Sequence, residues 1–244
     1  MKLNLKIMML TLAAAGAMFA SCDQDDDWAP ATNPNKGLEN GHEWVQLWKN
    51  GPKWATCNVG AAKPEQTGYY LAWGECAPKS EYTMMNYKWN KDGQDEGDVN
   101  FTKYNNDKTW GEVIDNQLTL LPEDDAATVV MGGKWRTPTV AECDTIRLKE
   151  YCQWTWMENY NGTGVNGYVV RGVTPGYTDS SIFLPACGNI WHEVTGYNEG
   201  GFYLSSDLQS DVCTTAQGFS FDKGLNYMYY VLRENGTSVR GCFR

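Results

Sequence analysis

Histidine is almost absent from this chain of 244 residues, in which only His42 and His192 occur, far apart in sequence. No Cys-x-x-Cys pair accompanies them, so the ligand spacing of a structural zinc site is missing. A Ser-His-Asp triad would have to use one of these two histidines, and neither has a nucleophile motif beside it. The sequence therefore argues against a zinc site and against a triad hydrolase, and we expect no cofactor.

Positive charge is also scarce, because 20 Lys and Arg face 30 Asp and Glu and leave a net charge of −10. A surplus of this sign repels phosphate backbones and anionic lipid headgroups. We therefore do not expect nucleic acid to be a partner of this protein. The same surplus favours solubility at a cell surface.

No apolar run is long enough to cross a bilayer, since a span needs roughly 20 apolar residues and the longest run, Ile7 to Ala20, has 14. Lys2 and Lys6 precede this run and small residues end it. A positive start, an apolar centre and a small-residue end are the features of a signal peptide. We therefore predict that residues 1–21 are a signal peptide.

Cys22 follows those small residues directly, and the pattern resembles a bacterial lipobox, in which the cysteine is acylated and becomes the mature N-terminus. The acidic run 23–27 resembles the surface-export signal of lipoproteins in the Bacteroides group. The resemblance implies a lipid-anchored outer-membrane protein that faces the exterior and meets the membrane only through its lipid. Residues 22–42, rich in Asp, Pro and Asn, are predicted to be a flexible acidic tether.

Residues 43–244 are predicted to form a single domain. Without residues 1–21 the chain keeps 18 basic and 30 acidic residues, a net charge of −12. Its 11 Trp, 14 Tyr, 7 Phe and 25 Gly indicate a loop-rich fold with many short strands. Seven cysteines remain after Cys22. Because seven is odd, at least one is unpaired, the spacings fix no disulfide connectivity, and we expect several to pack as small apolar groups.

Two helices are expected in the middle of the chain. Pro122 and the acids after it favour a helix start, which continues to Met131 and ends at the two glycines that follow. Thr139 and Glu142 form a capping box that begins a second helix, expected to run to about Lys149.

Strands are expected on both sides of these helices. Asn50-Gly51 between two apolar runs predicts a hairpin of 43–48 with 52–59, followed by a strand over 69–73. The polar segment 91–98 lacks the acid spacing of a calcium loop and is interpreted as a surface loop. The later candidates are Gln153–Met157, Tyr168–Gly172, Ser181–Pro185, Gly201–Ser205, Thr215–Phe221, Asn226–Leu232 and Ser238–Phe243. The pattern predicts an α+β fold.

Several segments, in this order, resemble the Fibrobacter succinogenes major paralogous domain family of exported proteins. They are KWATCNVGA (53–61), GYYLAWGE (68–75), EDDAA (123–127), GGKWRTPT (132–139), SIFLPA (181–186), YLSS (203–206) and GTSVR (236–240). The resemblance implies a C-type-lectin-like domain with two helices, twisted antiparallel sheets, long loops and termini close together. It also implies binding at the cell surface without naming a ligand. Most matched residues are expected to be scaffold, with Arg136 and Glu142 as a buried ion pair.

The leading hypothesis is a non-enzymatic surface module for recognition or adhesion, which binds a glycan or a surface or host protein. Loops on one face of such a fold supply the contacts, with rings that stack on sugars and polar groups that bind hydroxyls. The candidate residues are Trp191, Tyr197, Tyr203, Asp207, Asn226, Tyr227, Tyr229 and Arg233. For Tyr227 and Tyr229 the alternative is simple packing on one side of a sheet. The Glu-Pro-Asn and Trp-Asn-Asp loops of calcium-dependent lectins are absent.

Two other classes stay open. A structural docking subunit of a surface fibre or uptake complex would present a broad, flat apolar area, whereas a sugar site would be a small groove with a ring beside polar groups. An enzyme of the formylglycine-generating type would need two closely spaced active cysteines, and no pair matches. A glycosidase would need two facing carboxylates, and the sequence singles out none.

Overall fold

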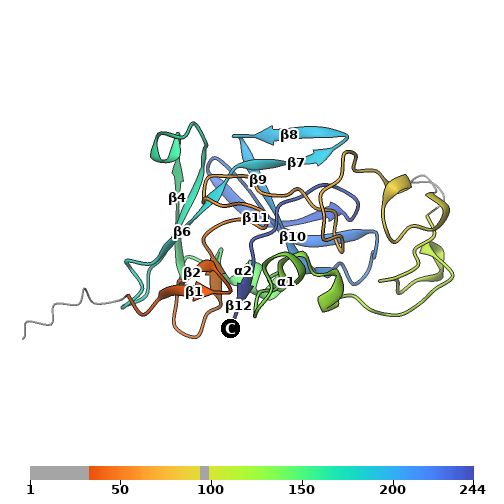
Figure 1. Cartoon of the computed structure of the whole chain (residues 1–244), viewed down its shortest axis with the longest axis horizontal. Coiled ribbons are helices and arrows are strands. Elements are labelled where there is room, and N and C mark those ends of the chain that lie inside the picture. Colours follow the sequence, from red (N-terminus) through yellow and green to blue (C-terminus); the bar gives the residue numbers. More distant parts are fainter. Residues whose placement is uncertain (1–32, 94–98) are drawn as a thin grey trace, which may run out of the picture. The chain divides into compact units, whose positions relative to one another are not determined.

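The computed structural model describes residues 33–93 and 99–244, which belong to one compact unit from Asn33 to Arg244. The predicted signal peptide, Cys22 and the tether up to residue 32 lie outside the described residues. In the part described, two short α-helices and twelve strands in three sheets give an α+β architecture (Figure 1). Strand pairing is antiparallel except between β7 and β9.

The first sheet joins the two ends of the described chain. Its strand order is β1 (Lys36–Glu39), β2 (His42–Gln46), β3 (Lys53–Ala55) and β12 (Cys242–Phe243). The hairpin of β2 and β3 around the predicted turn is confirmed, with Asn50 at a φ of 61°. The predicted start of ordered structure at Glu43 is wrong, because β1 lies inside the predicted tether and pairs with β2 along its whole length.

The other two sheets follow the helices in sequence. The order β4 (Cys152–Met157), β5 (Gly167–Gly172), β6 (Ser181–Pro185) makes a three-stranded sheet. The five-stranded sheet has the order β11 (Leu225–Leu232), β10 (Thr215–Asp222), β9 (Gly200–Leu208), β7 (Cys187–Trp191), β8 (Glu193–Tyr197). The predicted strands from 153 to 232 are confirmed within two or three residues, while the hairpin of β7 and β8 was not predicted. The strand expected at 238–243 shrinks to β12.

Both helices are shorter than expected. The chain makes a 3₁₀ turn at Pro122–Asp124, is interrupted at Asp125, and continues as α1 (Ala126–Met131), which ends at Gly132 with a φ of 67°. The capping box of α2 (Val140–Thr145) is confirmed, but the helix stops before Lys149. Ile146 is fully buried there, and tight turns after it lead the chain directly into β4. The segment 69–73 is an irregular stretch with one bridge, Leu71 to Thr237, and no strand.

Two apolar cores hold these elements together. One packs the long irregular segment from about 69 to 120 against α1 and one end of the five-stranded sheet. The other lies between the five-stranded and three-stranded sheets and includes Tyr168, Phe219 and Phe221. In Figure 1 the irregular segment, drawn yellow to yellow-green, lies at the opposite side of the five-stranded sheet from β4 and β6. A cavity of about 560 Å³ opens on the side near β4.

Candidate functional site

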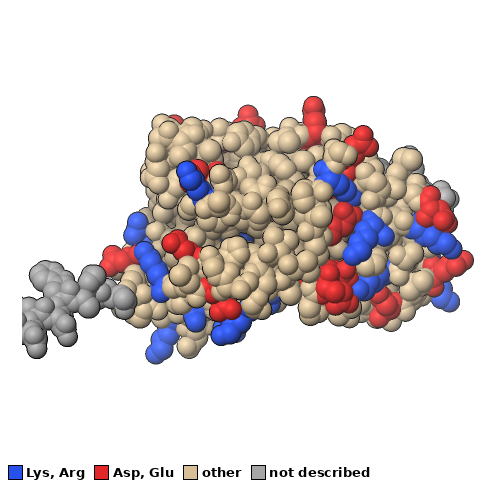
Figure 2. Space-filling model, in the orientation of Figure 1, with Lys and Arg blue, Asp and Glu red and all other residues tan. Residues whose placement is uncertain are grey.

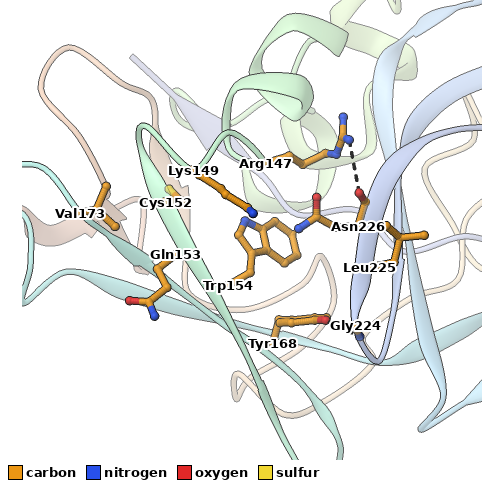
Figure 3. Close-up of a pocket in the computed structure, with 10 residues that line it drawn as sticks. All are labelled: Arg147, Lys149, Cys152, Gln153, Trp154, Tyr168, Val173, Gly224, Leu225 and Asn226. Carbon is orange, nitrogen blue, oxygen red and sulfur yellow. Dashed lines mark hydrogen bonds between the residues drawn. The ribbon is translucent and has the colours of Figure 1, made fainter.

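A cavity of about 560 Å³ lies where the three-stranded sheet meets the turn between β10 and β11. Three separate segments line it: the chain just after α2, strand β4 with its partner β5, and the first residues of β11 (Figure 3). The lining residues are Arg147, Lys149, Cys152, Gln153, Trp154, Tyr168, Val173, Gly224, Leu225 and Asn226.

Trp154 supplies the aromatic surface of this cavity. Its side chain alternates with exposed neighbours along β4, so its ring turns toward the interior side of the sheet and stays half-buried. The indole N–H donates to the Ile146 carbonyl at 2.9 Å, and the ring meets the edge of Tyr168 at a centroid distance of 5.3 Å. These contacts hold the ring in one orientation before any ligand arrives.

Tyr168 fixes the opposite wall. Its hydroxyl donates to the Asp222 carbonyl at 3.1 Å and accepts the Gly224 amide N–H at 2.9 Å. Both partners belong to the turn between β10 and β11, so the hydroxyl ties that turn to β5. The turn between β10 and β11 is therefore held apart from Trp154, and the cavity between them is preformed.

Arg147 and Lys149 bring positive charge to the rim. The Arg147 guanidinium donates through Nη1 to the Asp144 carboxylate at 2.7 Å and through Nη2 to the Asn226 carbonyl at 3.4 Å. Its Nε is buried without a hydrogen-bond partner in the part of the chain described. Lys149 is exposed, and in Figure 3 both side chains lie on the same side of the Trp154 ring.

Nucleophilic chemistry is disfavoured at this cavity. Burial raises the pKa of the Cys152 thiol to about 12, so the sulfur stays protonated near neutral pH. No Asp or Glu is among the residues that line the cavity, so the lining holds no carboxylate pair for glycoside hydrolysis. The lining also holds two aromatic rings, two cations and the Asn226 amide, which suit binding.

The predicted site residues do not come together in one place. Asn226 lines the cavity, but the neighbouring Tyr227 and Tyr229 project from the other face of β11. There Tyr229 meets Phe202 at 5.2 Å and Tyr227 at 6.2 Å between ring centroids, and both tyrosines keep part of their surface exposed. They share one side of the sheet, as the packing alternative predicted, and still form an accessible aromatic row.

Trp191 and Tyr197 lie elsewhere, on the β7–β8 hairpin, and are 55 % and 48 % exposed. Trp191 and His192 border a smaller cavity of about 160 Å³, which also contacts Tyr82 and Asn235. This second cavity is formed by the hairpin and the irregular segment, and it shares no lining residue with the first.

Burial contradicts a binding role for two predicted site residues, and a third, the half-buried Asp207, is already hydrogen-bonded within the fold. Tyr203 is 1 % exposed and Arg233 is fully buried, so neither side chain can contact a ligand at the surface. The Arg233 guanidinium instead donates to the Tyr87 hydroxyl and the Tyr104 carbonyl. Both carboxylate oxygens of Asp207 accept hydrogen bonds, from Thr119 and from the Val140 amide at the start of α2.

The principal cavity residues Trp154, Tyr168, Arg147 and Lys149 were not predicted. The alternation of Cys152, Trp154 and Trp156 along one strand was visible in the sequence, but such a pattern equally describes core packing. Lys149 was placed at the end of a helix, where a lysine is ordinarily explained by the helix dipole.

Comparison with known proteins finds no match to a family model, to a curated protein or to a solved structure. The resemblance to the Fibrobacter major-domain family therefore stays a prediction. Within residues 33–93 and 99–244, no helix is long and apolar enough to cross a membrane. In the same residues no group of three or more His, Cys, Asp or Glu side chains is placed to hold a metal ion.

Proposed function

We propose that this protein is a non-enzymatic glycan-binding module that uses the cavity around Trp154. One observation carries the proposal. A fixed, half-buried indole lies beside polar groups that can still form hydrogen bonds, in a cavity that is already formed. A sugar has an apolar C–H face and a rim of hydroxyls, and this combination offers a surface for each. The volume of about 560 Å³ lies within the range of about 300–1,000 Å³ typical of small-molecule sites.

Polar groups at the cavity can form hydrogen bonds with the hydroxyls of a sugar. The Asn226 side-chain amide lies beside the indole and makes no hydrogen bond within the described chain, whereas the Gln153 amide points away from the ring, to the other side of β4. The Asn226 amide offers both donors and an acceptor, which is what a sugar hydroxyl requires. The Tyr168 hydroxyl is already hydrogen-bonded to the turn at Asp222–Gly224. Its role is therefore to position this wall of the cavity.

A glycan array probed with the full chain in mild detergent tests this function. We expect binding to a defined sugar class, lost in Trp154→Ala and kept in Tyr229→Ala, whose ring lies on the other face of β11. Circular dichroism of both variants checks that they fold. Silence of the folded protein across the array contradicts the proposal.

A second function, docking to another surface protein, rests on a different observation. The β7–β8 hairpin exposes Trp191, Val194 and Tyr197. In Figure 2 charged side chains lie at the right end and along the lower left of the face shown, and uncharged residues cover much of its middle. If docking is the function, Trp191→Ala abolishes recovery of a specific outer-membrane partner while Trp154→Ala does not.

The location and family of the protein belong to the same proposal. Lipidation of Cys22 would display the domain on the outer membrane, as the signal pattern predicts. A C-type-lectin-like fold of the Fibrobacter major-domain type is supported by the two short helices, the long irregular segment and the pairing of both chain ends in one sheet. Incorporation of labelled palmitate that is lost in Cys22→Ser tests the anchor.

A further inference from the structure

We infer that the cavity around Trp154 selects acidic sugars, with Arg147 and Lys149 binding a carboxylate carried by the ring that stacks on the indole. This inference rests on the proposed glycan-binding function and specifies its ligand class.

The cavity lining differs in charge from the chain as a whole. Acids outnumber bases by 30 to 20 over the whole chain, yet two of the ten residues that line this cavity are basic and none is acidic. The surface of such a protein repels anions in general. A cavity whose lining carries a net positive charge is therefore the place where an anionic ligand is favoured.

Arg147 is held in a fixed position at the cavity. Asp144 accepts from Nη1 and the Asn226 carbonyl accepts from Nη2, so the guanidinium is held in place from two sides. The Asp144 side chain is 57 % exposed and is not part of the lining. The buried Nε–H keeps an unused donor, and a buried donor without a partner is costly unless a ligand or water satisfies it. The Nη atoms each carry a second N–H without a partner among the described residues, and these are the donors that remain for a ligand oxygen.

Lys149 adds a second positive charge to the lining. Two residues after Arg147, it is exposed and forms no ion pair among the described residues, so its ammonium is available to a ligand. With the Asp144 charge included, the group of Arg147, Lys149 and Asp144 carries one net positive charge. Figure 3 shows Arg147 and Lys149 on one side of the indole, so a carboxylate there lies at the edge of a stacked sugar ring. A uronic acid has this arrangement, with its carboxylate on C5 of the ring.

The matched probes are trigalacturonate and its methyl ester, which differ in charge while keeping the sugar skeleton. Calorimetric titration of the full chain in detergent is expected to show at least tenfold tighter binding of the acid, since charge-assisted hydrogen bonds are stronger than neutral ones. The preference is expected to shrink between 50 and 500 mM salt, because Lys149 is exposed to screening. A third probe, a galactose oligomer with one sulfate ester, separates carboxylate recognition from attraction of any anion.

Lys149→Gln is the variant that leaves the fold intact, because the side chain is exposed and unpaired. It is expected to weaken trigalacturonate binding about fivefold and to leave the methyl ester unaffected. Lys134→Gln removes the same charge from an exposed lysine outside the cavity and is expected to change neither. Arg147→Gln is expected to cost more than Lys149→Gln.

The outcomes separate this inference from the function on which it rests. Equal binding of acid and ester, or equal loss in Lys149→Gln for both, overturns the acidic preference and leaves glycan binding standing. Equal binding of the sulfate ester and trigalacturonate overturns the assignment to a carboxylate. No binding of any array sugar by the folded chain overturns the proposed function itself.

Discussion

Glu142 lies in the first turn of α2, and its carboxylate accepts several hydrogen bonds. Its carboxylate receives both Arg136 Nη atoms at 2.7 Å, the Thr139 amide at 3.0 Å and Arg244 Nε at 3.1 Å. The ion pair with Arg136 was predicted and is confirmed, although Arg136 keeps a third of its side chain exposed. Burial alone would raise the pKa of Glu142, but these hydrogen bonds outweigh it and lower the pKa to about 2.

Acid should therefore weaken the fold in a defined window. The carboxylate has a pKa near 4.5 when unfolded and about 2 when folded, so its contribution is complete above pH 4.5 and disappears as pH falls toward 2. The difference corresponds to stability on the order of 3 kcal/mol. Urea unfolding of Glu142→Gln should show that loss at pH 7 and a flatter pH dependence between 4.5 and 2. Glu193→Gln, which removes an exposed carboxylate, should retain the parental profile; an identical profile for Glu142→Gln would contradict the argument.

Cysteine reactivity should follow burial. Cys143, Cys152, Cys187, Cys213 and Cys242 are buried, as expected for small apolar groups, and Cys57 and Cys76 are partly exposed. Burial raises the pKa of Cys76 to about 11, and that of Cys143 and Cys242 well above the ordinary value. At pH 8 iodoacetamide should label Cys57 faster than any other of these seven thiols, read by peptide mass spectrometry, and the buried five only after unfolding. Native labelling of Cys143 would refute this.

At the scale of elements, Asp125 explains why the predicted helix is divided. Its Oδ1 accepts the Ala127 and Thr128 amides of α1 and also the Thr137 amide and hydroxyl. A single buried carboxylate thus begins α1 and fastens the chain that follows it. To act as N-cap, Asp125 leaves helical geometry, and the 3₁₀ turn before it cannot join α1.

Asp125→Ala should destabilise the protein by about 3 kcal/mol, because it leaves several buried donors unpaired as well as removing a cap. Chemical unfolding followed by tryptophan fluorescence measures this. Asp107→Ala is the matched control, since Asp107 also caps a short helix by accepting the Thr109 amide but is exposed. A loss no greater than that of the control would show that Asp125 acts only as a cap.

Local sequence signals predicted those elements whose chemistry is local. The turn at Asn50-Gly51 and the capping box at Thr139 depend on neighbouring residues and are confirmed. The β7–β8 hairpin depends on a close approach of backbones, since a Cβ at Gly188 would lie 2.0 Å from the Thr195 carbonyl oxygen. A glycine in an apolar run does not reveal such an approach. The cavity was missed for the same reason, because its three segments meet only in the folded chain.

Across the whole molecule, Arg240 joins parts of the fold that are distant in sequence. The side chain is fully buried, has no carboxylate partner among the residues that the structure describes, and donates to the carbonyls of Ala55 and Thr56, to Asn58 Oδ1 and to the Phe183 carbonyl. The first sheet and the three-stranded sheet are thereby tied to the last residues of the chain. Arg240 lies in one of the segments that carry the family resemblance, and its role here is scaffold, as expected.

Arg240→Lys should destabilise the protein by at least about 3 kcal/mol, because one ammonium cannot reach four acceptors and leaves buried carbonyls unpaired. Arg171→Lys is the control, since Arg171 is exposed and, within residues 33–93 and 99–244, donates to the Thr178 carbonyl alone. Hydrogen exchange should show the loss in β3, β6 and β12 together, because a single side chain connects them. Faster exchange in β3 alone would mean that the two sheets are held together by their apolar core, and that Arg240 acts only on the strand beside it.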